Sequence, residues 1–397
     1  MLTLMSHSYL RRAQGRLSLC ILLTCAPVLL CAQVQWQEGS LQELLQEAKE
    51  EEKFLFIDAY TDWCGWCKVM DEKSFSDPDL GQYMSEHFVS SKVNMEEGIG
   101  VDLAMKHRVT SYPSYLVLRS DGQLHCRLSG FLEADAFRQK LHAAVFDQDP
   151  LPEGKAPLDF VMDYPDWHRQ SFLKRKDRVN PTGEVIQDWL ASREMLYDEV
   201  SWGVLSRYVG GGPYGKIILE MRDSLIERYG KDEVNSKISS LIFNDVKTAI
   251  KDENRELLDA ALAACEEYLG EDGKTYQLRY RLYYYQMLKN WEAFAQVVET
   301  HRAANQVEDA LLLQAAKTLE RGQAEAELLS KAAGWIKAIV EQAPGDYGNM
   351  VLYTKLLYKS GQEQEALEQA RMAQSIRGED EQEDDFIQSI LSKQNKP

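Results

Sequence analysis

Two cysteines separated by two residues constrain this chain more than any other feature. Cys64 and Cys67 follow the apolar run Phe54–Ile57, which is typical of a buried strand, and precede Lys68–Lys73, which is typical of a helix. At such a junction the free backbone N–H groups and the helix dipole stabilise an anion. Cys64 is therefore expected to have a lowered pKa and to be the attacking sulfur. Cys67 is expected to be less exposed and to resolve the mixed disulfide.

The same cysteine spacing also fits half of a zinc site. Such a site needs two further ligands, usually a second close pair of cysteines or histidines. Cys126 and Cys265 stand alone in the sequence, and it predicts no role for either. A zinc knuckle or a purely structural disulfide is therefore the weaker alternative.

The residues around the pair resemble the thioredoxin superfamily over about residues 38–146. The family has an acidic residue six positions before the first cysteine, where this chain has Asp58. Other matches are a lysine on the next strand, the loop whose cis-proline faces the disulfide, and a glycine near the substrate groove. In this chain they are Lys92, Tyr112 with Pro113, and Gly130.

This resemblance implies a protein thiol–disulfide oxidoreductase whose sulfur atoms carry the electrons, with no organic cofactor or metal. Asp58 would accept the proton of Cys67. The alternative is that Asp58 has only a structural role, as a carboxylate whose hydrogen bonds are satisfied. Pro113 would hold the substrate backbone near the sulfur. Lys92 would be a partner for Asp58 or merely an exposed strand lysine.

A substrate groove beside the disulfide is also implied by the resemblance, and its expected residues are Trp63, Gly65, Trp66, Tyr112 and Gly130. For Trp66 the alternative is packing against the neighbouring domain. The family's usual Gly-Pro between the cysteines is Gly65-Trp66 here, and intervening residues tune the redox potential. An additional short helix is predicted from Pro78 to about His87, with Asp77 as its N-cap. This insertion resembles the thioredoxin-like domains of bacterial thiol:disulfide interchange proteins.

The predicted fold class is an α/β thioredoxin-like domain, with a central mixed sheet and helices on both faces, followed by an all-α repeat-like domain. In the first domain, strands and helices follow from apolar periodicity, and Asp121-Gly122 signals a hairpin. The predicted strands start at Phe54, Phe88, Tyr115 and Leu124. The predicted flanking helices include Glu38–Glu52, Gly100–His107 and Glu133–Phe146.

Residues 1–32 are typical of a signal peptide. Arginines precede the apolar run Leu17–Ala32, which is short for a membrane span. Cleavage after Ala32 would export the protein to a periplasmic or extracellular location. Cys31 leaves a membrane-attached lipoprotein as an alternative, although Leu30 occupies a position where a lipobox favours a small residue.

The remaining boundaries follow from composition. Residues 33–146 form the predicted thioredoxin-like domain, and the proline-rich residues 147–157 form the predicted linker. Residues 158–397 contain no convincing strand pattern and carry apolar residues at helical spacing, as in Val185–Val209 and Lys216–Tyr229. Ala293 and Ala366 lie in similar segments about two periods of ~34 residues apart, which resembles tetratricopeptide repeats.

Several function classes are disfavoured. A formal net charge of −18 gives no basic face for nucleic acid. Gly210–Lys216 has the spacing of a phosphate-binding loop, but Ile217 replaces its Ser or Thr and no strand precedes it, so we expect an interhelical loop. The tyrosines at 280 and 283–285 are expected to pack between helices, and the acidic run Glu379–Asp385 to be solvated.

The expected partners are protein substrates with disulfides or thiols and a redox partner protein, and the helical domain is expected to bind a protein. The rival hypothesis is a helical-repeat adaptor whose thioredoxin-like domain is a binding module with little turnover. The intact cysteine pair together with Asp58 and Pro113 argues against this rival.

Overall fold

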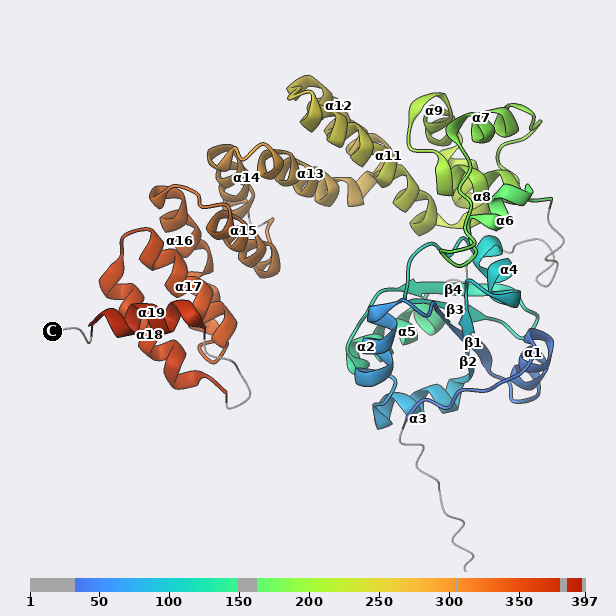
Figure 1. Ribbon diagram of the computed structural model, residues 1–397, viewed down its shortest axis with the longest axis horizontal. Helices are drawn as coiled ribbons and strands as arrows, with labels where there is room; N and C mark the ends of the chain where they lie inside the picture. Colours follow the sequence, from blue (N-terminus) through green and yellow to red (C-terminus); the bar gives the residue numbers. More distant parts are fainter. Residues whose placement is uncertain (1–32, 149–162, 305, 379–383, 395–397) are drawn as a thin grey trace, which may run out of the picture.

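A computed structural model describes residues 33–148, 163–304, 306–378 and 384–394 of the chain. It contains a compact α/β part followed by a long succession of helices (Figure 1). The predicted signal peptide, residues 149–157 of the predicted linker and residues 379–383 of the acidic run lie outside the described residues.

The α/β part is built on a four-stranded mixed sheet with the strand order β2-β1-β3-β4. Strand β1 is parallel to β2 and antiparallel to β3, and β3 is antiparallel to β4. The four strands are β1 (Phe54–Tyr60), β2 (Phe88–Asn94), β3 (Ser114–Leu118) and β4 (Leu124–Ser129). The predicted sheet is thereby confirmed.

Helices cover both faces of this sheet (Figure 1). Successive side chains of a strand point to opposite faces, so Leu55 and Ile57 of β1 join one buried cluster and Phe56 joins the other. The first cluster includes residues of α1 (Leu41–Glu50) and α4 (Gly98–Lys106). The second includes residues of α2 (Gly65–Lys73), α3 (Pro78–His87) and α5 (Ala134–His142).

Local capping explains where these helices begin. Ser40 and Glu43 form a capping box, so α1 starts later than the predicted helix from Glu38. Asp77 accepts the backbone N–H groups of Asp79 and Leu80, and α3 starts at Pro78 as predicted. After α5 the chain continues as a π-helical turn, η1 (Ala143–Asp147), which reaches into the predicted linker.

Every regular element among the described residues from 163 onward is helical, as predicted. The helices are α6 (Asp166–Gln170), α7 (Gly183–Ala191), α8 (Glu199–Tyr208), α9 (Gly212–Glu220), α10 (Arg222–Tyr229), α11 (Lys231–Lys251), α12 (Arg255–Leu269), η2 (Gly270–Asp272), α13 (Gly273–Met287), α14 (Trp291–Ala303), α15 (Asp309–Arg321), α16 (Ala326–Gln342), α17 (Tyr347–Lys359), α18 (Glu363–Ile376) and α19 (Asp385–Gln394).

Two of the predicted helical stretches are divided. Val185–Val209 becomes α7 and α8, because Asp198 caps a new helix by accepting the N–H groups of Val200 and Ser201. Lys216–Tyr229 divides at Met221 into α9 and α10. The expected interhelical loop over Gly210–Lys216 is wrong for most of its length: Gly210 and Gly211 lie between α8 and α9, whereas Gly212–Lys216 form the first turn of α9. A helix and not a strand precedes these residues, as the sequence predicted.

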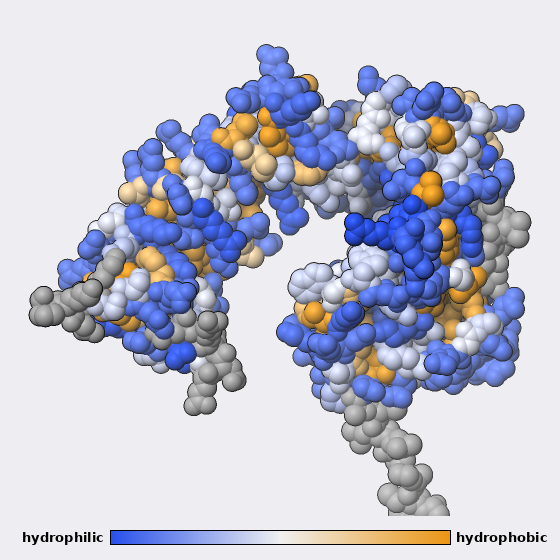
Figure 2. All heavy atoms as spheres, in the orientation of Figure 1, coloured by the Kyte–Doolittle hydropathy of each residue, from blue (hydrophilic) through white to orange (hydrophobic). Residues whose placement is uncertain are grey.

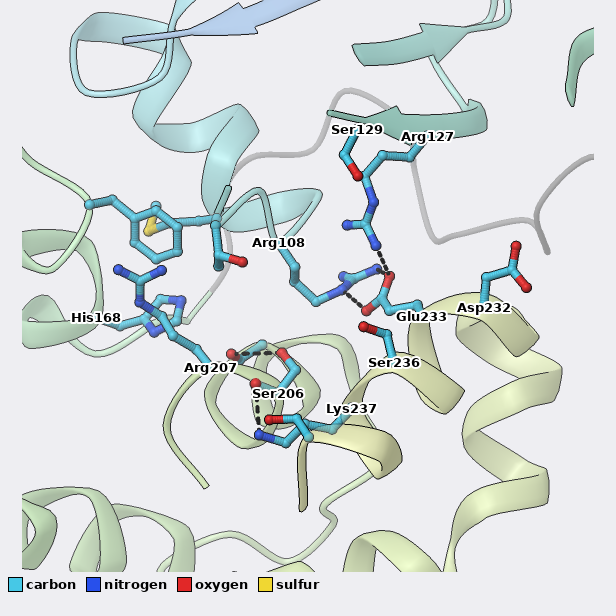
Figure 3. A pocket seen from close by; sticks show the side chains of 15 residues that line it. Arg108, Arg127, Ser129, His168, Ser206, Arg207, Asp232, Glu233, Ser236 and Lys237 are labelled. Atoms are coloured by element: carbon cyan, nitrogen blue, oxygen red, sulfur yellow. Dashed lines mark hydrogen bonds and ion pairs between the residues drawn. The ribbon is translucent and has the colours of Figure 1, made fainter. Parts of the chain in front are cut away.

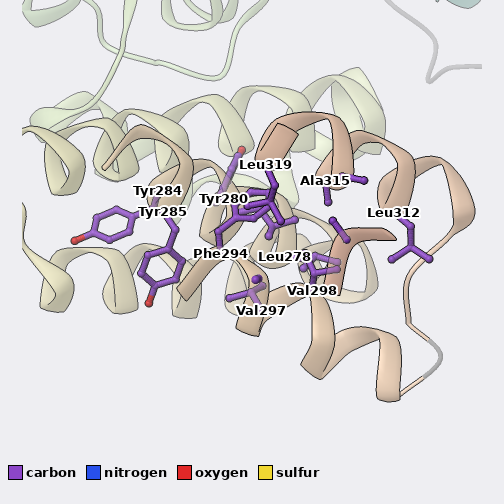
Figure 4. Packing of buried hydrophobic residues seen from close by; sticks show 14 of the residues in the cluster. Leu278, Tyr280, Tyr284, Tyr285, Phe294, Val297, Val298, Leu312, Ala315 and Leu319 are labelled. Carbon is purple, nitrogen blue, oxygen red and sulfur yellow. The ribbon is translucent and has the colours of Figure 1, made fainter. Parts of the chain in front are cut away.

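The helical part has a continuous apolar core formed by neighbouring helices (Figure 4). Tyr280, Tyr284 and Tyr285 of α13 are buried, which confirms helix packing for these tyrosines. Ala366 and Ala373 of α18 are fully buried, and such small side chains allow close helix approach. The tetratricopeptide resemblance itself stays a prediction.

The helices lead away from the α/β part, and α17–α19 lie across an open gap from it (Figure 1). The surface of the whole molecule on the side shown in Figure 2 is mostly hydrophilic, with scattered apolar residues. Within the described ranges, no helix combines the length and the apolar character needed to cross a bilayer.

Ion pairs join the two parts where the helical succession begins. Glu233 of α11 pairs with Arg108 and Arg127 of the α/β part, and Lys106 lies 3.6 Å from Glu199 of α8. The two parts therefore share a defined interface on the side of α4 and β4.

Candidate active site

The two cysteines are joined by a disulfide at the start of α2. Cys64 is the N-cap residue, and its Sγ accepts the backbone N–H of Cys67 at 3.1 Å. An amide that already points at this sulfur can stabilise a thiolate there after reduction. The expectation that Cys67 is less exposed is wrong: both residues are 4% exposed, because the closed disulfide holds the two sulfurs together under the same cover.

Asp58 lies on β1, directly opposite Lys92 of β2 in the parallel ladder. Its side chain is 2% exposed, and Oδ2 lies 3.3 Å from Lys92 Nζ. The same ammonium also pairs with Asp71, so Lys92 is not merely an exposed strand lysine. Asp58 Oδ1 has no hydrogen-bond partner.

The surroundings of Asp58 change its protonation. Burial raises its pKa to about 6, Lys92 opposes this rise, and the charge of Asp71 adds to it. A carboxyl group with this pKa exchanges protons close to neutral pH, and the free Oδ1 is an available acceptor.

The loop before β3 has the expected geometry. The Tyr112–Pro113 peptide bond is cis, as predicted. The Pro113 carbonyl accepts the N–H of Gly130 at 2.9 Å, which ties this loop to the end of β4. Gly130 has a φ of +89°, a conformation that side-chain-bearing residues rarely adopt.

Two tryptophans form an exposed apolar rim next to the disulfide. Trp63 and Trp66 are 62% and 61% exposed. Trp66 stacks on Phe131 with 5.5 Å between the ring centres, so its aromatic partner belongs to the same α/β part. Trp63 meets the edge of Tyr112 at 5.9 Å. A side chain added at Gly65 would contact nothing within 4 Å.

The helical part reaches this rim through residues that the sequence analysis did not single out. The Trp63 indole donates to Glu96 Oε2 at 3.0 Å, and Arg178 donates to Glu96 Oε1 at 2.5 Å. Lys174 pairs with Asp62 at 2.9 Å and also with Glu97. The sequence shows only that two acidic residues, Glu96 and Glu97, follow a strand. It does not indicate that their partners come from the helical part, much later in the chain.

The other two cysteines of the described chain have a different environment. Cys126 and Cys265 are free and buried, and burial raises the pKa of their thiols to about 12 and about 11. Both thiols therefore remain protonated at neutral pH. Within the described ranges, no group of three His, Cys, Asp or Glu side chains is placed to hold a metal ion.

Comparison with known proteins places this arrangement in a family. The family model Thioredox_DsbH, described as a protein of unknown function (DUF255), matches residues 29–147. Spermatogenesis-associated protein 20 of Homo sapiens is 41% identical over 61 residues, 15% of this chain and 8% of that protein. Thiol:disulfide interchange protein DsbD of Escherichia coli K12 is 33% identical over 105 residues, 25% of this chain and 18% of that protein.

Among solved structures, a putative disulphide-isomerase from Bacteroides thetaiotaomicron is 36% identical, with a TM-score of 0.28. The match covers 30% of this chain and 98% of that one. The chain spans less than a fifth of the length of the two curated relatives. The residues that the family model matches include the α/β part with its Cys64–Cys67 pair. The N-terminal α/β domain of this chain belongs to the thioredoxin superfamily.

Proposed function

We propose that this protein is an exported thiol–disulfide oxidoreductase that reduces or isomerises disulfides of other proteins. The observation that carries the proposal is the redox pair itself: Cys64 and Cys67 form a disulfide at the N-terminus of α2, with a backbone N–H directed at Cys64 Sγ. The neighbouring Asp58, buried and with a raised pKa, supplies a proton acceptor.

The reaction begins with the reduced pair. The Cys64 thiolate attacks one sulfur of a substrate disulfide, which forms a mixed disulfide and releases the other substrate sulfur as a thiolate. Cys67 then attacks Cys64 Sγ, which closes the Cys64–Cys67 disulfide and releases the second substrate sulfur. Two electrons pass to the substrate, and a redox partner protein must return two electrons to the pair.

Proton transfer accompanies the second step. Cys67 attacks as a thiolate, and its proton passes to Asp58, directly or through water. Lys92 holds the Asp58 side chain in place from the neighbouring strand. Between turnovers Asp58 returns this proton to solvent, since its pKa of about 6 makes it mostly ionised at pH 7.

The surroundings of the disulfide suit a protein substrate. Trp63 and Trp66 offer apolar surface, and Tyr112 with Gly130 lies on the cis-proline side. Pro113 would align the substrate backbone beside Cys64. The helical domain would bind a protein and bring it to this rim.

Export is a further part of the proposal. It rests on the signal-peptide pattern of residues 1–32 and on the likeness to a thiol:disulfide interchange protein. Lipid attachment through Cys31 would instead place the protein at a membrane surface.

The test is dithiothreitol-driven reduction of insulin by the wild type, Cys64→Ser and Cys265→Ala. We expect Cys64→Ser to fall to the uncatalysed rate, because its hydroxyl cannot replace the thiolate. Cys265→Ala is the matched control, since it removes a buried free thiol that plays no part in the mechanism. Equal rates for the wild type and Cys64→Ser would exclude the proposed turnover and favour the adaptor hypothesis.

A further inference from the structure

A cavity of about 420 Å³ lies between the α/β domain and the first helices of the helical part (Figure 3). The α/β domain contributes Arg108, Thr110, Arg127 and Ser129, and the helical part contributes residues of α6, α8 and α11. Its volume is within the ~300–1,000 Å³ typical of small-molecule sites. No feature of the proposed thiol chemistry uses this cavity.

The charges around the cavity do not balance. Four cationic side chains line it against two carboxylates, in a chain whose formal net charge is −18. Glu233 is fully engaged with Arg108 and Arg127 (Figure 3). Within the described residues, Arg207 and Lys237 have no carboxylate at ion-pair distance. Cations left without a counter-charge inside a cavity favour an anionic ligand.

Both unbalanced cations are held in fixed positions. The Arg207 guanidinium lies 3.9 Å from the centre of the Phe172 ring, and its Nη2 donates to Ser171 O at 2.9 Å. Lys237 Nζ donates to the carbonyls of Ser206 and Val209 at the end of α8. These contacts position the two groups, but carbonyl oxygens carry only partial charge and do not neutralise them.

His168 is a second, independent indication of a ligand. It lines the cavity and is 1% exposed, yet neither ring nitrogen has a hydrogen-bond partner. The ring stacks on Tyr164 at 4.6 Å, which fixes its plane. Burial lowers the pKa of His168 to about 3, so the neutral ring offers one N–H donor and one acceptor. Leaving both unpaired is unfavourable, and a bound molecule would satisfy them.

We propose that this cavity binds a small molecule bearing a carboxylate or phosphate group. Arg207 and Lys237 contact its anionic group, and His168 hydrogen-bonds to a polar atom beside that group. The site operates independently of Cys64 and Cys67, so its occupancy does not depend on the redox state of the disulfide.

Titration calorimetry on the full chain tests this assignment, with inorganic phosphate and succinate as separate probes at low ionic strength. We expect saturable one-to-one binding of at least one probe, and the better probe identifies the anionic group. Arg207→Gln should weaken that binding at least about tenfold, through the loss of a charge-assisted hydrogen bond. His168→Phe keeps the stacking on Tyr164, removes both nitrogens, and should weaken binding at least about threefold.

Lys247→Gln is the matched control, because it removes one positive charge from an exposed position on the same helix as Lys237. It should leave the affinity unchanged. If Arg207→Gln does not fold, Lys237→Gln tests the same contact from the other side. Absence of saturable binding up to ~10 mM of either probe would overturn the proposal. So would an equal loss of affinity in Arg207→Gln and Lys247→Gln.

Discussion

Asp58, which is buried, lies on the strand before the cysteine pair, and Glu233, which is partly buried, lies at the interface between the two parts. Asp58 shares its single cation, Lys92, with Asp71, and its Oδ1 has no partner. Glu233 uses both oxygens: it pairs with Arg108 and Arg127 and accepts the Trp202 indole N–H at 2.7 Å.

The consequence is an opposite response to burial. Burial raises the pKa of both groups, but at Glu233 the two arginines outweigh it and leave the pKa below its ordinary value. At Asp58 burial dominates and the pKa rises to about 6. The number of partners, and not burial alone, therefore decides whether a buried carboxylate exchanges protons or serves as a fixed charge.

The two groups also contribute to stability with opposite pH dependence. The pKa of Asp58 is raised on folding, so its contribution is complete below about pH 4 and is lost as the pH rises through about 6. The pKa of Glu233 is lowered on folding, so its contribution is present above about pH 4 and is lost as the pH falls.

The largest expected effect comes from removing the negative charge of Glu233 at the interface between the two parts. Glu233→Gln leaves Arg108 and Arg127 without a counter-charge, and we expect the free energy of unfolding at pH 7 to fall by about 3–5 kcal/mol. Urea denaturation followed by fluorescence measures this change. The loss should shrink as the pH falls below the ordinary glutamate range and through the lowered pKa of Glu233, because the wild-type carboxylate then becomes protonated as well.

Asp232→Asn is the control for this variant, since it removes an exposed carboxylate from the adjacent position. Its free energy of unfolding should stay within about 0.5 kcal/mol of the wild-type value. If Glu233→Gln behaves like Asp232→Asn, the interface does not depend on this ion pair.

The second effect concerns Asp58→Asn, which keeps the shape but cannot accept a proton. Formation of the Cys64 mixed disulfide should be nearly unchanged, whereas its resolution by Cys67 should slow by roughly tenfold or more. Stopped-flow reduction of a disulfide substrate near pH 7 separates the two steps. A wild-type rate of resolution would make Asp58 purely structural.

The same variant should be more stable than the wild type at pH 8, by roughly 1–3 kcal/mol, because no charge remains to be buried. This gain should vanish near pH 4, where wild-type Asp58 is neutral. A gain that does not change with pH would show that packing, and not ionisation, accounts for it.

Much of the fold could be predicted because its determinants are local. Asp77 and Pro78 start α3 through a cap and a favourable first residue, and the strand-to-helix junction at Cys64 follows from a change of periodicity. The cis bond before Pro113 could be predicted only from the family resemblance, because most bonds that precede proline are trans.

The partners that cross the interface could not be predicted. Arg178 is 82 residues from Glu96, and Glu233 is 125 residues from Arg108. Periodicity identifies a charged residue on a helix face but does not say which distant residue covers it. His168 likewise gave no signal, since its burial depends on how α6 packs against α8 and the α/β domain.

The smallest expected effect concerns Asp71, which shares the ammonium of Lys92 with Asp58. Asp71 raises the pKa of Asp58 through its charge and competes for Lys92. In Asp71→Asn the ammonium pairs with Asp58 alone, so the pKa of Asp58 should fall toward that of a fully paired carboxylate such as Glu233.

The rate of mixed-disulfide resolution, measured from pH 5 to 8, should then follow a profile shifted to lower pH by less than about one unit, with less than a twofold change at pH 7. Glu72→Gln provides the control, since Glu72 is exposed on the same helix next to Asp71. Its profile should coincide with that of the wild type. If the Asp71→Asn profile also coincides, the charge of Asp71 and its competition for Lys92 do not influence the protonation of Asp58. Burial alone would then set that pKa, and the number of cationic partners would not explain the contrast with Glu233.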